Sequence, residues 1–279
     1  VLFRSGGRHR ASDDSGQPFF AALSVQPPHD PYLAPPEYME RHNPATLQMR
    51  PNVPDTTART RGKARRELAG YYAQIENLDH NVGRVVQTVC ERGLGDNTWI
   101  IFFSDHGDMH GSHGQFRKMS PYEEALRIPF IVWTQQARYD LRCRVGDVPV
   151  NHVDIAPTTL GLCGIDTPPA MQGTDYSGLI VPGRDAGEVP DSAYVQSVVP
   201  TGHGDSVDRP WRGVVTRDGW KYVCLEGQPW MLYDLNDDPY EQANLAHNTI
   251  FGGRRRELHR RLARWVEATG DEFALPEIG

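Results

Sequence analysis

The sequence predicts an α/β protein with a mostly parallel sheet flanked by helices, followed by a small C-terminal subdomain of antiparallel strands and a helix. Apolar runs without alternation, at residues 98–104 and 128–134, are typical of strands that are covered on both faces, as in parallel sheets. A long amphipathic stretch at residues 63–91 precedes them, and this strand and helix order favours an α/β class. After about Gly187 short strands separated by turn signals replace this pattern, which indicates antiparallel pairing.

The first elements follow from local patterns. Residues 18–26 (PFFAALSVQ) are a short apolar run that predicts a buried strand. Three prolines in residues 27–32 predict a loop directly after it, because proline has no N–H to donate and a fixed φ. Apolar side chains recur every three or four positions across residues 63–91, which predicts a single helix that ends before Gly93.

The later elements are predicted in the same way. Residues 152–162 predict a helix that begins near Asp154, with Pro157 in its first turn. An antiparallel meander is predicted from short strands at residues 193–199, 212–216, 221–225 and 230–234. Residues 254–269 predict a closing amphipathic helix.

Three regions divide the chain. Residues 1–17 are mostly polar and follow no element pattern, so we expect a disordered or non-native lead. Residues 18–187 are expected to be the C-terminal part of a larger α/β domain, and residues 188–279 a C-terminal α+β subdomain.

The composition excludes several classes of protein. The 279 residues carry a net charge of −7, which argues against a surface built to bind nucleic acid or anionic lipid. No run of roughly 18 apolar residues is present, so no membrane span is predicted. The four cysteines form no C-x-x-C pair, so neither a zinc ribbon nor a thioredoxin-like motif is present.

The polar stretch at residues 104–118 (SDHGDMHGSHGQFRK) carries the strongest chemical signal. Asp105 and His106 directly follow a buried strand, where side chains can converge outside the edge of a sheet. A carboxylate and an imidazole at such a place are ligands for a divalent cation. Lys118 adds a compact positive charge for an anionic oxygen.

Other hydrolase chemistries lack their motifs. The metallo-β-lactamase pattern H-x-H-x-D-H and the zinc motif H-E-x-x-H are absent. The serine hydrolase motif G-x-S-x-G and the Walker phosphate loop are absent too.

The stretch S-D-H-G-D-M-H-G-S-H-G-Q-F-R-K-M, followed by P-Y-E-E-A-L-R-I-P-F-I-V, closely resembles the second metal-binding block of formylglycine-dependent sulfatases in the alkaline phosphatase superfamily. Its Asp-His pair is similar to the branch that contains iduronate sulfatase and choline sulfatase. The segments P-F-F-A-A-L-S-V-Q-P-P-H-D-P-Y and D-L-N-D-D-P-Y-E-Q-A-N-L resemble other blocks of the family in the family's order. The resemblance covers residues 18–279 and implies an alkaline phosphatase-like fold.

The resemblance also implies roles for single residues. Asp105 and His106 match the two later metal ligands of the family, and Lys118 matches the lysine that touches the sulfate and the reactive aldehyde hydrate. His29 matches the histidine that contacts the sulfate and can protonate the leaving group, and His113 matches a substrate-pocket histidine. His110 has no family role, and we expect it to be a loop-packing or solvated side chain. The resemblance therefore predicts that the side chains of His29, Asp105, His106 and Lys118 share one cavity.

The nucleophile of the family is not found in this chain. No cysteine or serine stands in the C-x-P-S-R or S-x-P-S-R context that yields formylglycine. We therefore interpret the chain as the C-terminal part of a sulfatase that cleaves a sulfate ester of a carbohydrate or small molecule, and we expect it to be inactive alone. The implied cofactors are one divalent cation, calcium in most of the family, and a formylglycine outside this sequence.

Two alternatives remain at this point. A phosphonate monoester or phosphodiester hydrolase of the same superfamily has the same blocks and often uses manganese or iron, which a histidine ligand suits better than calcium. A non-catalytic, sulfatase-like anion-binding protein is also consistent with the missing nucleophile. The resemblance implies a periplasmic, secreted or lysosome-like compartment.

Overall fold

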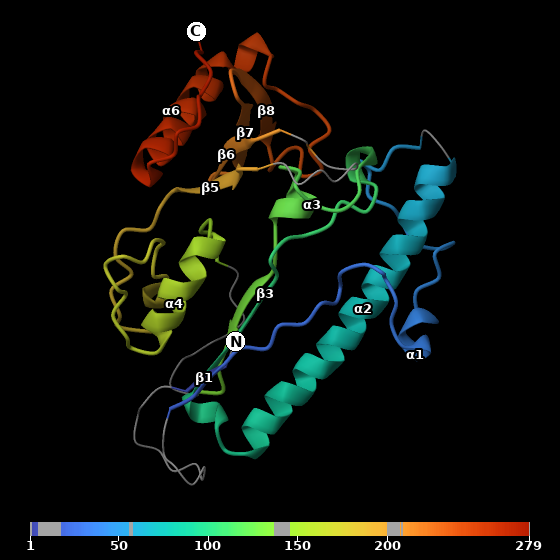
Figure 1. The fold of residues 1–279 in the computed structure, drawn as a ribbon, viewed down its shortest axis with the longest axis vertical. Coiled ribbons are helices and arrows are strands. Elements are labelled where there is room, and N and C mark those ends of the chain that lie inside the picture. The colour runs from blue at the N-terminus through green and yellow to red at the C-terminus, as the bar shows by residue number, and fades with distance from the viewer. Residues whose placement is uncertain are drawn as a thin grey trace.

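The computed structural model describes residues 2–4, 18–55, 58–136, 146–199, 207 and 209–278. The first sheet has the strand order β2 (Phe20–Ala21), β1 (Leu2–Arg4), β3 (Thr98–Phe103) and β4 (Phe130–Trp133). The second has the order β5 (Ser192–Ser197), β6 (Trp211–Thr216), β7 (Trp220–Leu225) and β8 (Gln228–Asp234). Figure 1 shows the two sheets in different parts of the molecule, with helix α2 alongside the first and helix α6 beside the second.

The three longer helices agree with the sequence patterns. Helix α2 (Ala58–Glu91) begins earlier than predicted and ends at the predicted position, just before Gly93, whose φ is +65°. Helix α4 (Ile155–Leu162) follows the single turn His152–Asp154, which Asn151 and Asp154 close with a reciprocal capping box. Helix α6 (Gly252–Thr269) buries Leu258 and Leu262. Three short helices complete the set: α1 (Pro36–Met39), α3 (Glu123–Leu126) and α5 (Ser177–Ile180).

The pairing within the first sheet differs from the predicted mostly parallel arrangement. Strand β1 pairs antiparallel with both β2 and β3, and β3 pairs antiparallel with β4. Strands β3 and β4 are joined by a loop that leaves and re-enters the sheet at one edge, and such a connection produces antiparallel neighbours. Strands β2 and β3 still run in the same direction, because each is antiparallel to β1. The segments that follow β2 and β3 therefore leave from the same edge.

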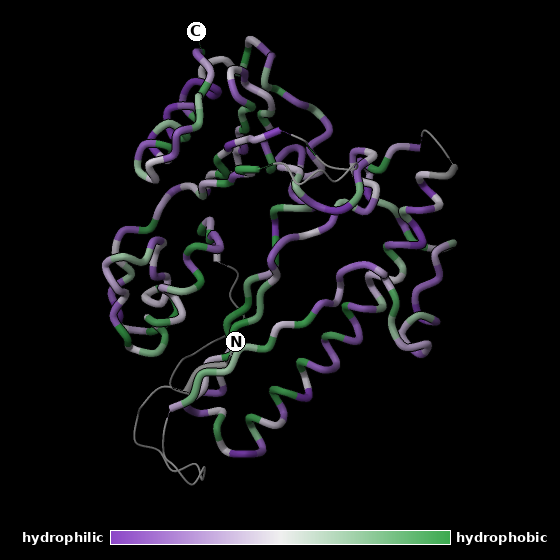
Figure 2. Tube along the Cα trace, in the orientation of Figure 1, coloured by the Kyte–Doolittle hydropathy of each residue, from purple (hydrophilic) through white to green (hydrophobic). Residues whose placement is uncertain are grey.

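The burial of the strands also differs from one predicted strand to the next. In β3 Trp99 and Ile101 are buried against Leu162 of α4, as the apolar pattern predicts. The stretch 18–26 was expected to be buried, but it forms only the two-residue strand β2, and Phe20 and Leu23 are 62% and 70% exposed. In the described part of the chain β2 is an edge strand of only two residues, so it does not reach the buried position that the apolar pattern predicts. Figure 2 shows hydrophobic residues along these strands.

The second sheet is the antiparallel meander that the sequence predicts, and it has a core on each face. One face packs against α6 through Val214, Tyr222, Leu232, Leu258 and Leu262. The other face packs against Tyr122, which precedes α3, and Leu126, the last residue of α3. The second sheet therefore supports the segment that leads out of the loop after β3.

Some sequence predictions fall outside the described residues. Apart from β1, residues 1–17 are outside them, and so is Cys143. The proposed boundary between residues 187 and 188 stays a prediction. Within the described part of the chain, no helix has the length and apolar character that crossing a membrane requires.

Candidate functional site

The loop between β3 and β4 carries most of the residues singled out in the sequence. Its two arms are joined by backbone hydrogen bonds from Met109 N to Arg117 O at 2.8 Å and from Gly111 N to Gln115 O at 2.7 Å. A third bond runs from Gly107 N to Ala125 O at 2.9 Å. A Cβ atom on Gly107 would collide with the carbonyl oxygen of Glu124, in α3. Only glycine therefore allows the loop to pass this close to α3.

The backbone of this loop is locally strained. Four of its residues have φ between +43° and +75°, a region that residues other than glycine seldom adopt: His110, His113, Arg117 and Met119. Among the described residues only Glu241 shares this property without being glycine. Strain of this kind persists where surrounding contacts fix the conformation, and it is common at functional sites.

Asp105 and His106 lie where β3 ends, and their geometry suits a cation. The Nδ1 of His106 is 2.8 Å from the carbonyl oxygen of Gly107, and because a carbonyl only accepts, Nδ1 carries the proton. When the ring is neutral, Nε2 is therefore the nitrogen with the free lone pair, and it lies 3.5 Å from Oδ2 of Asp105. Histidine ligands of metals commonly donate their other N–H to a carbonyl in this way. The Asp105 side chain is 84% exposed, so its carboxylate is open to a further ligand.

The charge state of Asp105 is favourable for the same role. Partial burial opposes its ionised form, but the neighbouring His106 and hydrogen bonds from the backbone and from Ser104 outweigh this effect and lower the pKa of Asp105. The carboxylate is thus ionised at neutral pH.

His29 and Lys118 meet although 89 residues separate them in the sequence. The Nζ atom of Lys118 lies 2.9 Å from Nε2 of His29, and an ammonium group can only donate. The Nδ1 of His29 donates to the carbonyl oxygen of Asp30 at 2.9 Å. His29 is therefore the neutral Nδ1–H tautomer here, with Nε2 accepting from Lys118.

Several residues that the sequence did not single out hold the His29 loop in place. The Nε2 amide of Gln74, on α2, faces the carbonyl oxygens of His29, Pro31 and Leu33 at 3.0 to 3.3 Å. Arg117 donates to the hydroxyl of Tyr32 at 2.8 Å, which links the His29 loop to the loop after β3. Only the position of Gln74 near the apolar stripe of a helix hints at such a role.

Asp108 and His110 are structural members of the loop. Asp108 accepts from the hydroxyl of Tyr32 at 2.5 Å and from the backbone N–H groups of His110 and Arg117. The His110 ring is buried, with its centroid 4.4 Å from that of Tyr71. Of the two expected states for His110, the structure shows loop packing.

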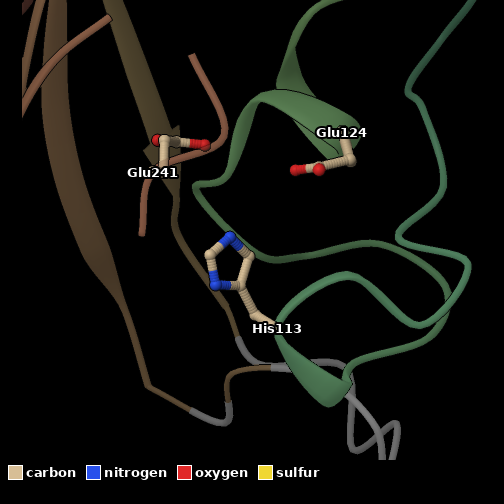
Figure 3. A group of neighbouring side chains, drawn as sticks. All are labelled: His113, Glu124 and Glu241. Carbon is tan, nitrogen blue, oxygen red and sulfur yellow. The ribbon is translucent and has the colours of Figure 1, made fainter. Parts of the chain in front are cut away.

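His113 belongs to a different group of side chains. Its ring stacks on Tyr122, with the centroids 3.7 Å apart and the planes at 9°, and its neighbours include Glu124 and Glu241. Burial lowers the pKa of His113, while Glu124 acts in the opposite direction. Burial raises the pKa of Glu241 to about 7, and the adjacent Lys221 opposes this rise. Figure 3 shows the three side chains pointing toward one another.

The structure thus forms two pairs, Asp105 with His106 and His29 with Lys118, on segments that leave the first sheet from the same edge. A carboxylate, a tethered imidazole, an ammonium group and a second imidazole suit a cation and an oxyanion.

Comparison with known families agrees with this chemistry. The family model described as Sulfatase matches residues 9–165, and the one described as N-sulphoglucosamine sulphohydrolase, C-terminal, matches residues 111–268. The chain belongs to the sulfatase family, whose members generally bind a divalent metal ion.

The curated relatives include several bacterial sulfatases. This chain is 33% identical to the ulvan-active sulfatase of Formosa agariphila over 267 residues. This matched region covers 95% of this chain and 50% of that protein. The chain is also 29% identical to the choline-sulfatase of Rhizobium meliloti, over 85% of this chain and 48% of that protein. The chain spans about half the length of the curated relatives that it matches.

Solved structures show the same fold. The putative sulfatase yidJ from Bacteroides fragilis has a TM-score of 0.74 and 28% identity, over 88% of this chain and 53% of that one. The phosphonate monoester hydrolase of Agrobacterium radiobacter also has a TM-score of 0.74, over 87% of this chain and 55% of that one. Its identity is 19%, so this second likeness concerns the fold alone. The alkaline phosphatase-like fold is confirmed.

Proposed function

We propose that this chain is the C-terminal half of a sulfuric ester hydrolase and carries two metal ligands together with part of the sulfate site. The observation that carries the proposal is the Asp105–His106 pair, whose Oδ2 and Nε2 atoms lie 3.5 Å apart at the end of β3. Ligand atoms that share one cation at 2.0–2.4 Å lie about this far apart. The sulfatase family model spans the same loop.

Asp105 and His106 would hold the cation, for which we propose Ca²⁺, with Mn²⁺ as the alternative that an imidazole ligand favours. A bound divalent cation supplies positive charge that polarises a sulfate oxygen. The open carboxylate of Asp105 and the tethered ring of His106 suit such an ion.

Lys118 would bind the sulfate group and balance the negative charge that grows on it during ester cleavage. Such fixed charges stabilise a transition state by several kcal/mol when the site excludes water. His29 orients Lys118 through the 2.9 Å contact between Nε2 and Nζ. In this arrangement Nε2 is an acceptor, so His29 can protonate a leaving alcohol only after Lys118 has turned toward the sulfate and Nε2 has gained a proton.

The substrate class that we propose is a sulfated carbohydrate. The names of three relatives support it: an ulvan-active sulfatase, an endo-4-O-sulfatase and an N-acetylglucosamine-6-O-sulfatase. The last two are from Bacteroides thetaiotaomicron. His113 was expected to face the substrate, but its contacts with Tyr122 and Asn52 favour a structural position.

The chain alone should not turn over a substrate, because the motif that yields formylglycine is absent from its sequence. The test is an assay of the purified chain with an aryl sulfate such as 4-nitrophenyl sulfate, with and without added Ca²⁺. We expect no release of 4-nitrophenol above the buffer rate. Turnover that is retained in both Asp105→Asn and Lys118→Ala variants would contradict the assigned roles.

A further inference from the structure

Three side chains from separate segments converge at a place that the proposed sulfate chemistry does not use. His113 comes from the loop after β3, Glu124 from α3, and Glu241 from the segment that follows β8. One ligand atom from each residue lies within 4.8 Å of the others. Figure 3 shows the His113 ring pointing toward the gap between the two carboxylates.

The carboxylate of Glu124 is a second observation that points to a ligand in this group. Its side chain is only 6% exposed. Its Oε1 accepts from Nδ2 of Asn52 at 2.8 Å, and Arg50 lies 3.7 Å from that same oxygen. Its Oε2 is buried and has no hydrogen-bond partner among the described residues. A buried carboxylate oxygen without a partner has lost its hydration and gained no hydrogen bond in exchange, which is unfavourable. A cation bound to this oxygen would compensate for that loss.

His113 is already held in a ligand-like orientation. The parallel stack on Tyr122 fixes the plane of its ring, and Nε2 accepts a hydrogen bond from Nδ2 of Asn52 at 3.1 Å, which a metal ion at Nε2 would replace. An imidazole that is fixed before binding loses little conformational entropy when it takes a metal ion.

The local charge is negative even after the known ion pairs are counted. Lys221, which is fully buried, lies 2.7 Å from Oε1 of Glu241 and 2.6 Å from Oε1 of Glu123. Oε2 of Glu241 accepts from the backbone N–H of Glu123 at 2.7 Å. Three carboxylates, those of Glu123, Glu124 and Glu241, therefore face one buried ammonium group and the partly exposed Arg50. A carboxylate oxygen has more than one lone pair, so Glu241 can still bind a cation.

We propose that His113, Glu124 and Glu241 form a second cation site, which binds a divalent transition-metal ion such as Zn²⁺. One imidazole and two carboxylates are a common ligand set for zinc, at about 2.0–2.2 Å from each ligand atom. Binding would require side-chain movements that draw the three ligand atoms, now within 4.8 Å of one another, closer together. The ion would join the loop that carries Lys118 to the C-terminal sheet, and the site is independent of sulfate hydrolysis.

The test measures Zn²⁺ binding to the purified 279-residue chain by calorimetry after chelation of residual metal. For this test the chain is prepared as the double variant Asp105→Asn and His106→Ala, so that the proposed Ca²⁺ ligands cannot contribute. We expect one Zn²⁺ ion to bind to this double variant. Adding His113→Phe keeps an aromatic ring on Tyr122 but removes the ligand, and the affinity should fall at least about tenfold.

Two further variants complete the test. Glu124→Gln keeps an oxygen for Asn52 and should weaken Zn²⁺ binding in the same way, so it replaces His113→Phe if circular dichroism shows that the latter fails to fold. His247→Phe removes an exposed histidine and should leave the affinity unchanged. Equal affinity in the double variant with and without either site substitution would overturn the proposal, and so would failure of the folded double variant to bind Zn²⁺.

Discussion

His110 shows how one buried residue links pH to stability. Its ring lies among Tyr32, Tyr71 and Asp108, and neither ring nitrogen has a hydrogen-bond partner among the described residues. Burial lowers the pKa of His110 to about 4, against the opposing charge of Asp108 and with a smaller contribution from Arg50 and Arg117. The folded protein therefore holds a neutral imidazole at a pH where the unfolded chain is already protonated.

The sign of the effect follows from linkage. An unfolded histidine has a pKa of about 6.5, so the stability is complete above that pH and is lost as the pH falls toward 4. Between pH 7.5 and pH 5.0 the loss due to His110 should be about 2 kcal/mol. We predict that His110→Phe lacks this part of the acid destabilisation. Urea unfolding of both proteins at the two pH values measures this difference. Any cost of placing Phe at a φ of +43° affects the variant equally at both pH values, so it cancels in the comparison. An equal loss in both proteins would contradict the prediction.

Sequence reasoning reached some residues of the site and not others. Asp105 and His106 are adjacent and directly follow a strand, so the motif and its place in the fold were both legible. Gln74 and Tyr32 act through contacts with loops far away in the sequence, and no local pattern encodes such contacts. The unpartnered Oε2 of Glu124 likewise exists only because the fold buries it.

At the scale of elements, one ion pair ties the end of α6 to the second sheet. Asp271 lies just after the helix ends at Gly270 and accepts from Nε and Nη2 of Arg212, in β6, at 2.5 and 3.1 Å. The hydroxyl of Tyr194, in β5, donates to the same carboxylate at 2.6 Å. The hydrogen bond from Arg212 is the main reason why the pKa of Asp271 falls to about 2.

We predict that Asp271→Asn lowers the free energy of unfolding by about 3 kcal/mol at pH 7, because it leaves the buried Arg212 without its partner. The matched control is Asp147→Asn, whose pair with Arg217 is exposed, and its effect should stay below about 0.5 kcal/mol. The contribution of Asp271 is present above the unfolded pKa near 4 and is lost as the pH falls toward 2, so the variant and wild type should converge there. Urea unfolding at pH 7 and near pH 2 measures these effects. Equal effects of the two substitutions at pH 7 would contradict the prediction.

The strands show what an apolar pattern can predict. Residues 18–26 and residues 98–104 have the same kind of apolar run, yet β3 is buried between neighbours and β2 is an exposed edge. The pattern reports that side chains are suited to burial, while the neighbouring elements decide whether burial occurs. Strand direction is equally non-local, because the loop between β3 and β4 determines their antiparallel pairing. Helices α2, α4 and α6 and the C-terminal meander depend on local periodicity and turns, and they were predicted well, whereas the short helices α1, α3 and α5 were not predicted.

At the scale of the whole molecule, the second sheet supports the loop that carries Lys118. Nε1 of Trp211 donates to the carbonyl oxygen of Met119 at 3.1 Å, and Nζ of Lys221 donates to that of Pro121 at 2.9 Å. Both bonds reach the backbone directly after Lys118. The C-terminal part is therefore a structural support for the proposed sulfate site.

The central claim, a cation site at Asp105 and His106 next to His29 and Lys118, is tested most directly by NMR with paramagnetic Mn²⁺. Mn²⁺ broadens resonances near the place where it binds, so the measurement locates even a weak site. The account predicts broadening of the amide resonances of residues 104–107, 29–30 and 118, which is lost in Asp105→Asn. Broadening near Glu124 and Glu241 reports separately on the second site. Unchanged broadening of residues 104–107 in Asp105→Asn, or none there in the wild-type chain, would contradict the account.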